Sequence, residues 1–328
     1  MREGKPSSTA ILIANTIAFL SFDPQLGQLI PPGMAEMNGW FIERTRTVRW
    51  LGGVVDRRWF RALIFTAERW HVPGLMLHAL LRKLYLEALT RQCLLQGVQQ
   101  VVVLGAGFDT LALRLHRDFS QVVFIEVDHP QTQHVKRQSL TGRGLPRANL
   151  QLLPVDFTCQ TLAQSLLACP LYDAKRDALF IAEGVLMYLE PGDIDGLFAF
   201  VREHSGRGSK FAFTFMSRWG KRIGFAKNSP LADFWLRTRG EPLRWGATPE
   251  EIPAFLAERG FESQELAGPQ TFRQRYLEPC GLFHVPLAQG EYVCLAQRQR
   301  FTDRGKTPQG AVAQSGDEPR PRQPGFEL

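Results

Sequence analysis

The stretch VVVLGAGFDTLALRL, residues 101–115, contains the strongest fold signal in this chain. A short run of β-branched and apolar residues is typical of a buried strand, and the glycines at 105 and 107 allow a tight turn. The leucine-rich segment that follows favours a helix. Many folds bind a nucleotide where a strand passes through such a turn into a helix. The glycine turn alone does not identify which nucleotide would bind there.

Composition indicates a globular protein. The chain has 328 residues, of which 44% are hydrophobic and 22% charged. The net charge is +7, but Lys and Arg are scattered, so we expect no nucleic-acid partner. The five cysteines form no CxxC pair and show no metal-ligand spacing, which favours a reducing compartment and predicts no metal site.

One apolar segment near the start could be the core of a signal peptide or a buried helix. ILIANTIAFLSF, residues 11–22, is too short to span a bilayer, and Asn15 and Thr16 interrupt it. We interpret it as a buried helix capped by Ser7 or Ser8 rather than as a signal peptide. The sequence therefore predicts a cytoplasmic protein with no membrane partner.

The chain divides into three parts. Residues 1–96 are predicted to form an N-terminal helical cap that covers the cofactor; its last helix, within residues 74–97, ends at Gly97. Residues 97–300 alternate short apolar runs (VVVLG, VVFIEVD, ALFIAEG, KFAFTFM and EYVCLAQ) with segments of helical length, which predicts a parallel sheet covered on both faces. Within that domain we interpret residues 218–248 as a lid insert. Residues 301–328 are polar and rich in Pro and Gly, which predicts a disordered tail.

The glycine turn favours one kind of ligand. Gly105 and Gly107 would let the backbone approach a ligand closely. A dinucleotide-binding turn has a third glycine three positions later, where this chain has Thr110 preceded by Asp109. A carboxylate would repel a pyrophosphate but suits a ligand with an ammonium and a sulfonium, as in S-adenosylmethionine. A turn that binds nothing remains the alternative.

Acidic residues follow three further predicted strands. Glu126 and Asp128 come about 20 residues after the glycines, where an acid commonly binds ribose hydroxyls. Asp156 and Phe157 stand where an adenine amino group and ring would lie. Glu183 follows the apolar run ALFIA and would be costly to bury without a partner. All of them are predicted to lie at the carboxyl edge of the sheet, where α/β proteins bind ligands.

Four motifs together carry a family resemblance. LGAGFDTLALRL, FIEVDHP, VDF and FIAEGVLMYL, in this order and spacing, resemble the leucine carboxyl methyltransferase family, in its bacterial class I branch that depends on S-adenosylmethionine. The resemblance extends over about residues 5–298 and implies a Rossmann-like α/β fold with a seven-stranded, mostly parallel sheet and helices on both faces. It implies S-adenosyl-L-methionine as the cofactor, with contacts at Gly105, Asp128, Asp156, Phe157 and Glu183.

The family also uses a helix arginine for the cofactor carboxylate. Arg82 is the best match in this chain, and Lys83 and Arg91 are the alternatives. Many relatives have a basic residue in the first helix, whereas this chain offers only Asn15 there. The sequence departs from the family at that point.

The sequence indicates less about the methyl acceptor than about the cofactor. A carboxylate is ionised at neutral pH and needs no general base, whereas a hydroxyl would need one. Tyr188 is a candidate catalytic residue, and Trp235, Arg244 and Trp245 are candidates for binding an anionic, partly apolar acceptor. We expect an O-methyltransferase that acts on a small molecule or a protein C-terminus.

Two other functional classes remain open. One is a regulator that binds the cofactor without turnover. The other is a nucleotide-dependent oxidoreductase, which Thr110 and Asp109 disfavour because of the missing third glycine and the added charge. The sequence predicts no oligomeric state.

Overall fold

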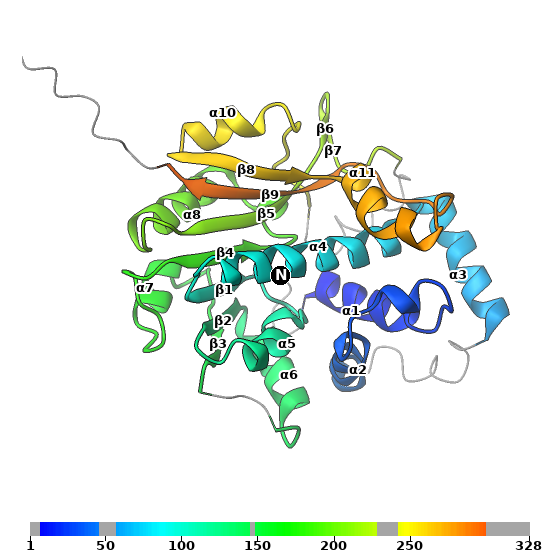
Figure 1. Ribbon diagram of the computed structural model, residues 1–328, viewed down its shortest axis with the longest axis horizontal. Coiled ribbons are helices and arrows are strands. Elements are labelled where there is room, and N and C mark those ends of the chain that lie inside the picture. The colour runs from blue at the N-terminus through cyan, green and yellow to red at the C-terminus, as the bar shows by residue number, and fades with distance from the viewer. Residues whose placement is uncertain (1–6, 46–56, 145–147, 228–241, 300–328) are drawn as a thin grey trace, which may run out of the picture.

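The computed structural model describes residues 7–45, 57–144, 148–227 and 242–299 (Figure 1). The predicted lid residue Trp235 and the predicted tail lie outside these ranges. The helices are α1 (Ser8–Leu20), η1 (Gly27–Leu29), α2 (Met34–Thr45), α3 (Arg58–His71), α4 (Leu75–Leu95), α5 (Leu111–Asp118), α6 (Pro130–Leu140), α7 (Leu162–Leu167), η2 (Leu186–Tyr188), α8 (Pro191–Glu203), α10 (Ile252–Ala257), α11 (Pro269–Phe272), the π-helical η3 (Arg273–Leu277) and η4 (Glu278–Cys280). The strands are β1 (Gln100–Leu104), β2 (Val123–Asp128), β3 (Leu150–Pro154), β4 (Ala178–Ala182), β5 (Lys210–Met216), β6 (Arg218–Trp219), β7 (Arg222–Ile223), β8 (Phe261–Ala267) and β9 (Glu291–Arg298).

Seven of the described strands form one sheet, in the order β3-β2-β1-β4-β5-β9-β8. β1 pairs in parallel with β2 and β4, with Gln100 opposite both Val123 and Ala178. β9 runs antiparallel to its neighbours β5 and β8. The strand order reverses between β1 and β4, and open α/β sheets bind ligands in the crevice at such a switch point.

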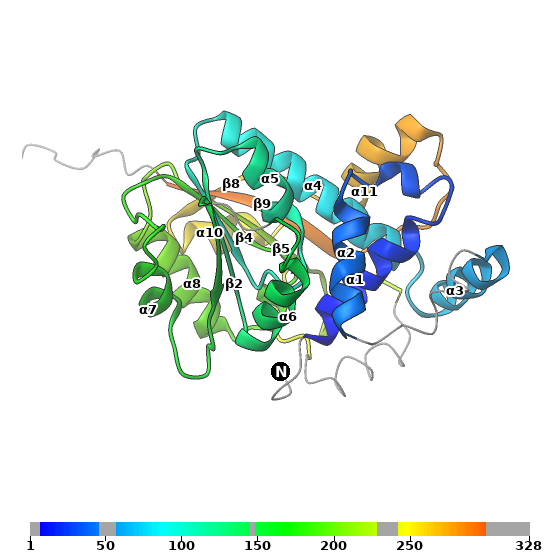
Figure 2. The same ribbon diagram turned by 90° about the horizontal axis from the view of Figure 1, so that it is seen from below.

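Helices cover both faces of the sheet, as the sequence predicts. Figure 2 shows α7, α8 and α10 on one side and α4, α5 and α6 on the other, with α1 and α2 stacked beyond them. Every residue of β1 and β4 is buried, because a parallel strand covered on both faces has no side open to water. The result is a Rossmann-like α/β fold with a seven-stranded, mostly parallel sheet.

The N-terminal helices form where the apolar pattern predicts them. The Ser7 hydroxyl accepts a hydrogen bond from the Ala10 amide and caps α1, and Ala14, Ile17 and Leu20 of that helix are buried. α4 is followed by Gly97 at a φ of +97°, a conformation that favours glycine. Among the described helices, none has the length and hydropathy needed to cross a bilayer.

Candidate cofactor site

The glycine turn between β1 and α5 is tightly packed. Gly105 and Gly107 have φ values of +62° and +51°, in the left-handed region. A Cβ at Gly105 would lie 2.7 Å from Val185 Cγ2, and one at Gly107 would lie 3.0 Å from Ala10 Cβ. The turn therefore requires glycine for its backbone conformation and, at Gly105, for space as well.

Asp128, the last residue of β2, is hydrogen-bonded directly to this turn. Its carboxylate accepts hydrogen bonds from the Gly107 amide at 2.5 Å and the His129 amide at 2.6 Å. Burial raises the pKa of Asp128, while the two amides act in the opposite direction. Each carboxylate oxygen has a second lone pair, so this group can still accept from hydroxyl donors of a ligand.

Glu183 lies directly after β4, at the switch point, and is paired with two cations from α4. Its side chain is 9% exposed and accepts from Arg82 Nε at 2.9 Å and from Lys83 Nζ at 3.0 Å. Lys83 Nζ also lies 3.2 Å from Asp109 Oδ1, in the glycine turn. The structure thus brings the adjacent residues Arg82 and Lys83 together with Asp109 and Glu183, which are remote from them in sequence.

Asp109 has a second role at the start of α5. Its carboxylate accepts from the amides of Thr110 at 2.7 Å and Leu111 at 3.3 Å. Burial opposes ionisation, but Lys83 and Lys136 outweigh it and lower the pKa of Asp109. Asp109 is therefore a fixed negative charge beside the turn.

Glu291 is a site residue that sequence reasoning missed. It is the first residue of β9, and both of its oxygens accept from Arg82 Nη1, at 2.5 and 2.7 Å. His78 Nε2 lies 3.1 Å from Glu291 Oε2. Burial opposes ionisation, but Arg82 and His78 outweigh it and lower the pKa of Glu291 to about 2. The signal that could have indicated this residue is an acid at the head of the apolar run YVCLA.

Glu126 lies deeper than the sequence suggests. It is fully buried within β2, and Lys136 Nζ of α6 lies 2.5 Å from Glu126 Oε2. Lys136 also donates to the Asp109 carbonyl at 2.6 Å. Burial raises the pKa of Glu126 to about 7, although Lys136 acts in the opposite direction. What the structure shows for Glu126 is an ion pair; a contact with ribose stays a prediction.

Asp156 and Phe157 occupy the exposed loop after β3. The Asp156 carboxylate accepts from the Thr158 hydroxyl at 2.7 Å and amide at 2.9 Å, and these bonds lower its pKa. The Phe157 side chain is 57% exposed. An exposed aromatic ring at the carboxyl edge of the sheet is available to stack on a planar ligand.

The predicted acceptor residues lie beside η2. The amides of Arg244 and Trp245 both donate to the Met187 carbonyl, at 2.8 and 3.3 Å, next to half-buried Tyr188. The Arg244 side chain is about half exposed and pairs with Glu190 at 2.5 Å.

Trp245 packs against Phe255, with ring centroids 5.0 Å apart, so its ring is part of the protein interior.

Arg91 and Asn15 make contacts away from Glu183. Arg91 pairs with Glu87 and Asp118 and does not reach Glu183. Of the three basic candidates, the structure brings Arg82 and Lys83 to the cluster. The Asn15 amide donates to the Ile11 carbonyl within α1.

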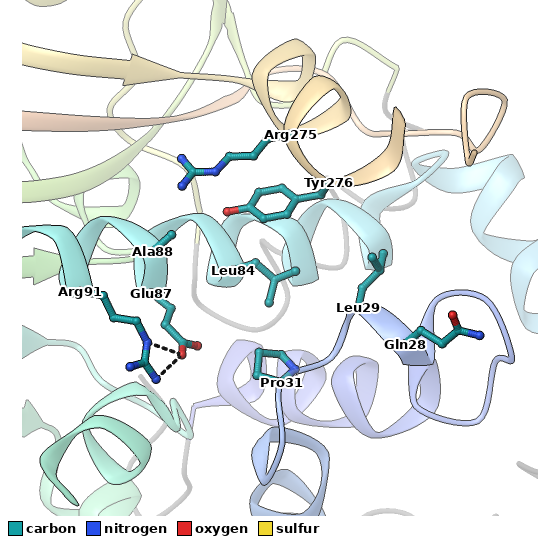
Figure 3. Close-up of a pocket in the computed structure, with 9 residues that line it drawn as sticks. All are labelled: Gln28, Leu29, Pro31, Leu84, Glu87, Ala88, Arg91, Arg275 and Tyr276. Carbon is teal, nitrogen blue, oxygen red and sulfur yellow. Dashed lines mark hydrogen bonds and ion pairs between the residues drawn. The ribbon is translucent and has the colours of Figure 1, made fainter. Parts of the chain in front are cut away.

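A separate pocket of about 420 Å³ lies on another face of α4 (Figure 3). Leu84, Glu87, Ala88 and Arg91, spaced three and four residues apart, face it from α4. Arg82 points instead toward Glu183 and Glu291, so this pocket is not the candidate site. Within the described ranges, no group of three or more His, Cys, Asp or Glu side chains is placed to hold a metal ion.

Curated sequences that are similar to this chain are named as methyltransferases. A relative from Mycobacterium sp. (strain JLS), named "Putative S-adenosyl-L-methionine-dependent methyltransferase", is 30% identical over 181 residues, which is 54% of this chain and 60% of the relative. A relative from Mycolicibacterium smegmatis with the same description is 30% identical over 207 residues, covering 56% of this chain and 68% of the relative. The chain spans about 60% of the length of the first of these curated relatives.

Solved structures share the fold. A crystal structure described as a "putative methyltransferase" from Thermobifida fusca YX matches with a TM-score of 0.53 at 20% identity, over 91% of this chain and 97% of that one. A DUF574 family protein from Streptomyces avermitilis MA-4680 matches with a TM-score of 0.55 at 13% identity, over 91% and 99%. The family model described as leucine carboxyl methyltransferase matches residues 36–202, which contain the glycine turn, Asp128 and Glu183. With that match over half of its length, this chain belongs to the leucine carboxyl methyltransferase family.

Proposed function

We propose that this chain is an S-adenosyl-L-methionine-dependent methyltransferase that methylates an oxygen atom. The observation that carries the proposal is the mixed-charge cluster at the switch point, where Arg82 and Lys83 meet Glu183 and Asp109. The amino-acid end of the cofactor has both a carboxylate and an ammonium. A site with cations and anions side by side is complementary to both groups.

Each part of the site has a role in this proposal. The glycine turn holds Asp128 in place through the Gly107 amide, and Asp128 accepts hydrogen bonds from the ribose hydroxyls. Phe157 stacks on the adenine, and Asp156 accepts from its amino group. Arg82 and Lys83 bind the carboxylate, while Glu183 and Asp109 accept from the ammonium. These residues fit the cofactor because its carboxylate and ammonium would each meet an opposite charge in the cluster of Arg82, Lys83, Asp109 and Glu183.

The sulfonium of the bound cofactor supplies an activated methyl group, so the protein has mainly to orient the nucleophile. We favour a carboxylate on a small molecule or peptide terminus as the acceptor, because an ionised carboxylate needs no base. Arg244, half exposed beside η2, would attract that anion. Tyr188 would orient a hydroxyl acceptor, which is the second possibility.

The cysteines also fit this proposal. All five are unpaired, which suits catalysis in a reducing compartment such as the cytoplasm.

The test is incubation of the full chain with methyl-labelled S-adenosylmethionine and a cell extract, followed by identification of the labelled product. We expect a labelled product that loses its label in mild base if it is an ester and keeps it if it is an ether. The Asp128→Ala variant, still folded, should transfer far less label. Binding of the cofactor with no product from any extract would instead favour a regulator. Binding of NADH without S-adenosylmethionine would favour an oxidoreductase.

A further inference from the structure

Helix α3 is exposed in an unusual way. It lies at the edge of the molecule, remote from the sheet, in both views (Figures 1 and 2). All of its residues are described, and none of them is buried. Phe65 holds it to the body through a ring contact with Phe19 at 5.4 Å, and Glu68 through a bond from the Met76 amide at 2.6 Å.

The outer face of α3 is apolar. Trp59, Leu63 and Trp70 have exposed fractions of 63%, 56% and 79%. Their spacing of four and seven residues puts them on one side of the helix. Isolated exposed apolar residues are ordinary, but three large ones in a row on one helix form a patch that indicates an interaction surface.

Positive charge flanks this apolar row. Arg58 and Arg69 are both exposed and are eleven residues, or about three turns, apart, so they lie one above the other along the helix, about a quarter to a third of a turn round from the row. The only acid of the helix, Glu68, points inward to the Met76 amide. Burial raises the pKa of Glu68 to about 7, which weakens its negative charge further.

We propose that the α3 face, formed by Arg58, Trp59, Leu63, Arg69 and Trp70, docks on an anionic lipid surface. An amphipathic helix with Trp and Leu beside Arg is the arrangement that lies in the plane of a membrane interface. Tryptophan favours the headgroup level, and arginine is attracted to anionic lipids. Such a helix lies on the bilayer without crossing it, which agrees with the lack of a spanning segment among the described helices.

A second copy of this chain fits the α3 face less well. A two-fold contact would oppose the positive edges of two identical helices. One side of a 14-residue helix covers an area about 20 Å long and 10 Å wide, whereas a stable interface buries about 800 Å² on each partner. The lipid proposal is independent of the proposed methyltransferase activity.

The experiment is sedimentation of the full chain with vesicles. We expect binding to vesicles of phosphatidylcholine and phosphatidylglycerol in a ratio of three to one, and little binding to phosphatidylcholine alone. High salt should weaken it, because the charge attraction is screened. The Trp59→Ser/Trp70→Ser variant should lose about tenfold or more in partitioning, and the Arg58→Glu/Arg69→Glu variant should lose its preference for anionic vesicles.

Matched controls use exposed residues outside α3. Phe283→Ser removes an exposed aromatic ring, and Arg207→Glu/Lys221→Glu makes the same change in net charge. Both controls should bind like the parent chain, and all variants should keep its melting temperature. Failure of the parent chain to bind anionic vesicles would overturn the proposal, as would equal losses in the controls. A dimer that the tryptophan substitutions dissociate, with no vesicle binding, would assign the face to a second copy instead.

Discussion

At the residue scale, the glycine turn shows how a motif specifies a site. Gly105 needs a positive φ and also leaves no room for a side chain beside Val185. Gly142 has a similar φ of +77° but nothing within 4 Å of its missing Cβ. Comparing the two separates backbone strain from crowding.

We expect Gly105→Ala to destabilise the protein more than Gly142→Ala. Both substitutions place alanine in the left-handed region, at a cost of about 1 kcal/mol. At position 105 the new methyl group must also displace Val185, which packs at the turn. The measurement is the free energy of unfolding from denaturant titrations of both variants. Equal losses would mean that Val185 yields freely and that the turn is less crowded than described.

Individual residues of the candidate site differ in how far the sequence predicts them. The sequence indicates Asp128 and Glu183 because Asp128 ends one apolar strand and Glu183 directly follows another, and such strand ends collect at one edge of the sheet. The sequence does not indicate Glu291, because its partner lies far away in the chain; Arg82 and Glu291 are 209 residues apart. A side-chain pair of that separation leaves no local pattern.

At the scale of elements, α4 links the mixed-charge cluster at the switch point to β9, on the antiparallel side of the sheet. It presents Arg82 to Glu183, directly after β4, and to Glu291 on β9, and it presents His78 to Glu291 as well. Both oxygens of Glu291 accept from Arg82 Nη1, while Glu183 Oε1 lies within bonding distance of Nε and Nη2. We therefore expect Glu291 to fix the direction of the guanidinium.

The Glu291→Gln variant tests this positioning role. It keeps the size of the side chain but loses the charge that orients Arg82, so the affinity for S-adenosylhomocysteine should fall by about tenfold. Adenosine, which lacks the amino-acid end, should bind as it does to the parent chain. Calorimetric titration of both ligands gives the comparison. If both affinities fell together, the substitution would be disturbing the fold rather than Arg82.

Elements also differed in how well the sequence predicted them. The central strands β1, β4 and β5 each contain an apolar run that predicts a strand, whereas the sequence does not predict β8 (Phe261–Ala267). β8 pairs only with β9, and its interior alternates between exposed and half-buried residues, so FESQELA has no apolar run. The antiparallel direction of β9 depends on tertiary packing, and residue types alone do not encode it.

At the scale of the whole molecule, buried ionised groups link stability to pH. The pKa of Glu291 is about 2 in the folded chain, below its ordinary value of 4.5. A lowered pKa means that the unfolded chain binds the proton more tightly. The stabilisation is therefore present above about pH 4.5 and is lost as the pH falls toward 2.

We expect this group to contribute about 3 kcal/mol to the acid-dependent part of the unfolding free energy. In the Glu291→Gln variant, the fall in unfolding free energy between neutral and acid pH should therefore be smaller than in the parent chain. Urea titrations across that range measure the slope for both proteins. Identical slopes would show that the pKa of Glu291 is not lowered by folding.

The proposed function depends above all on a cofactor at the switch point with Glu183 facing its ammonium. The most direct measurement is calorimetric titration of S-adenosylhomocysteine into the parent chain and the Glu183→Gln variant. Glu87→Gln is the control, because Glu87 is also a carboxylate of low exposure paired with an arginine, Arg114, but faces the other pocket. We predict binding to the parent chain, a loss of roughly ten- to a hundredfold in Glu183→Gln, and little change in Glu87→Gln. Undiminished binding to a folded Glu183→Gln variant, or no binding to the parent chain, would contradict the account.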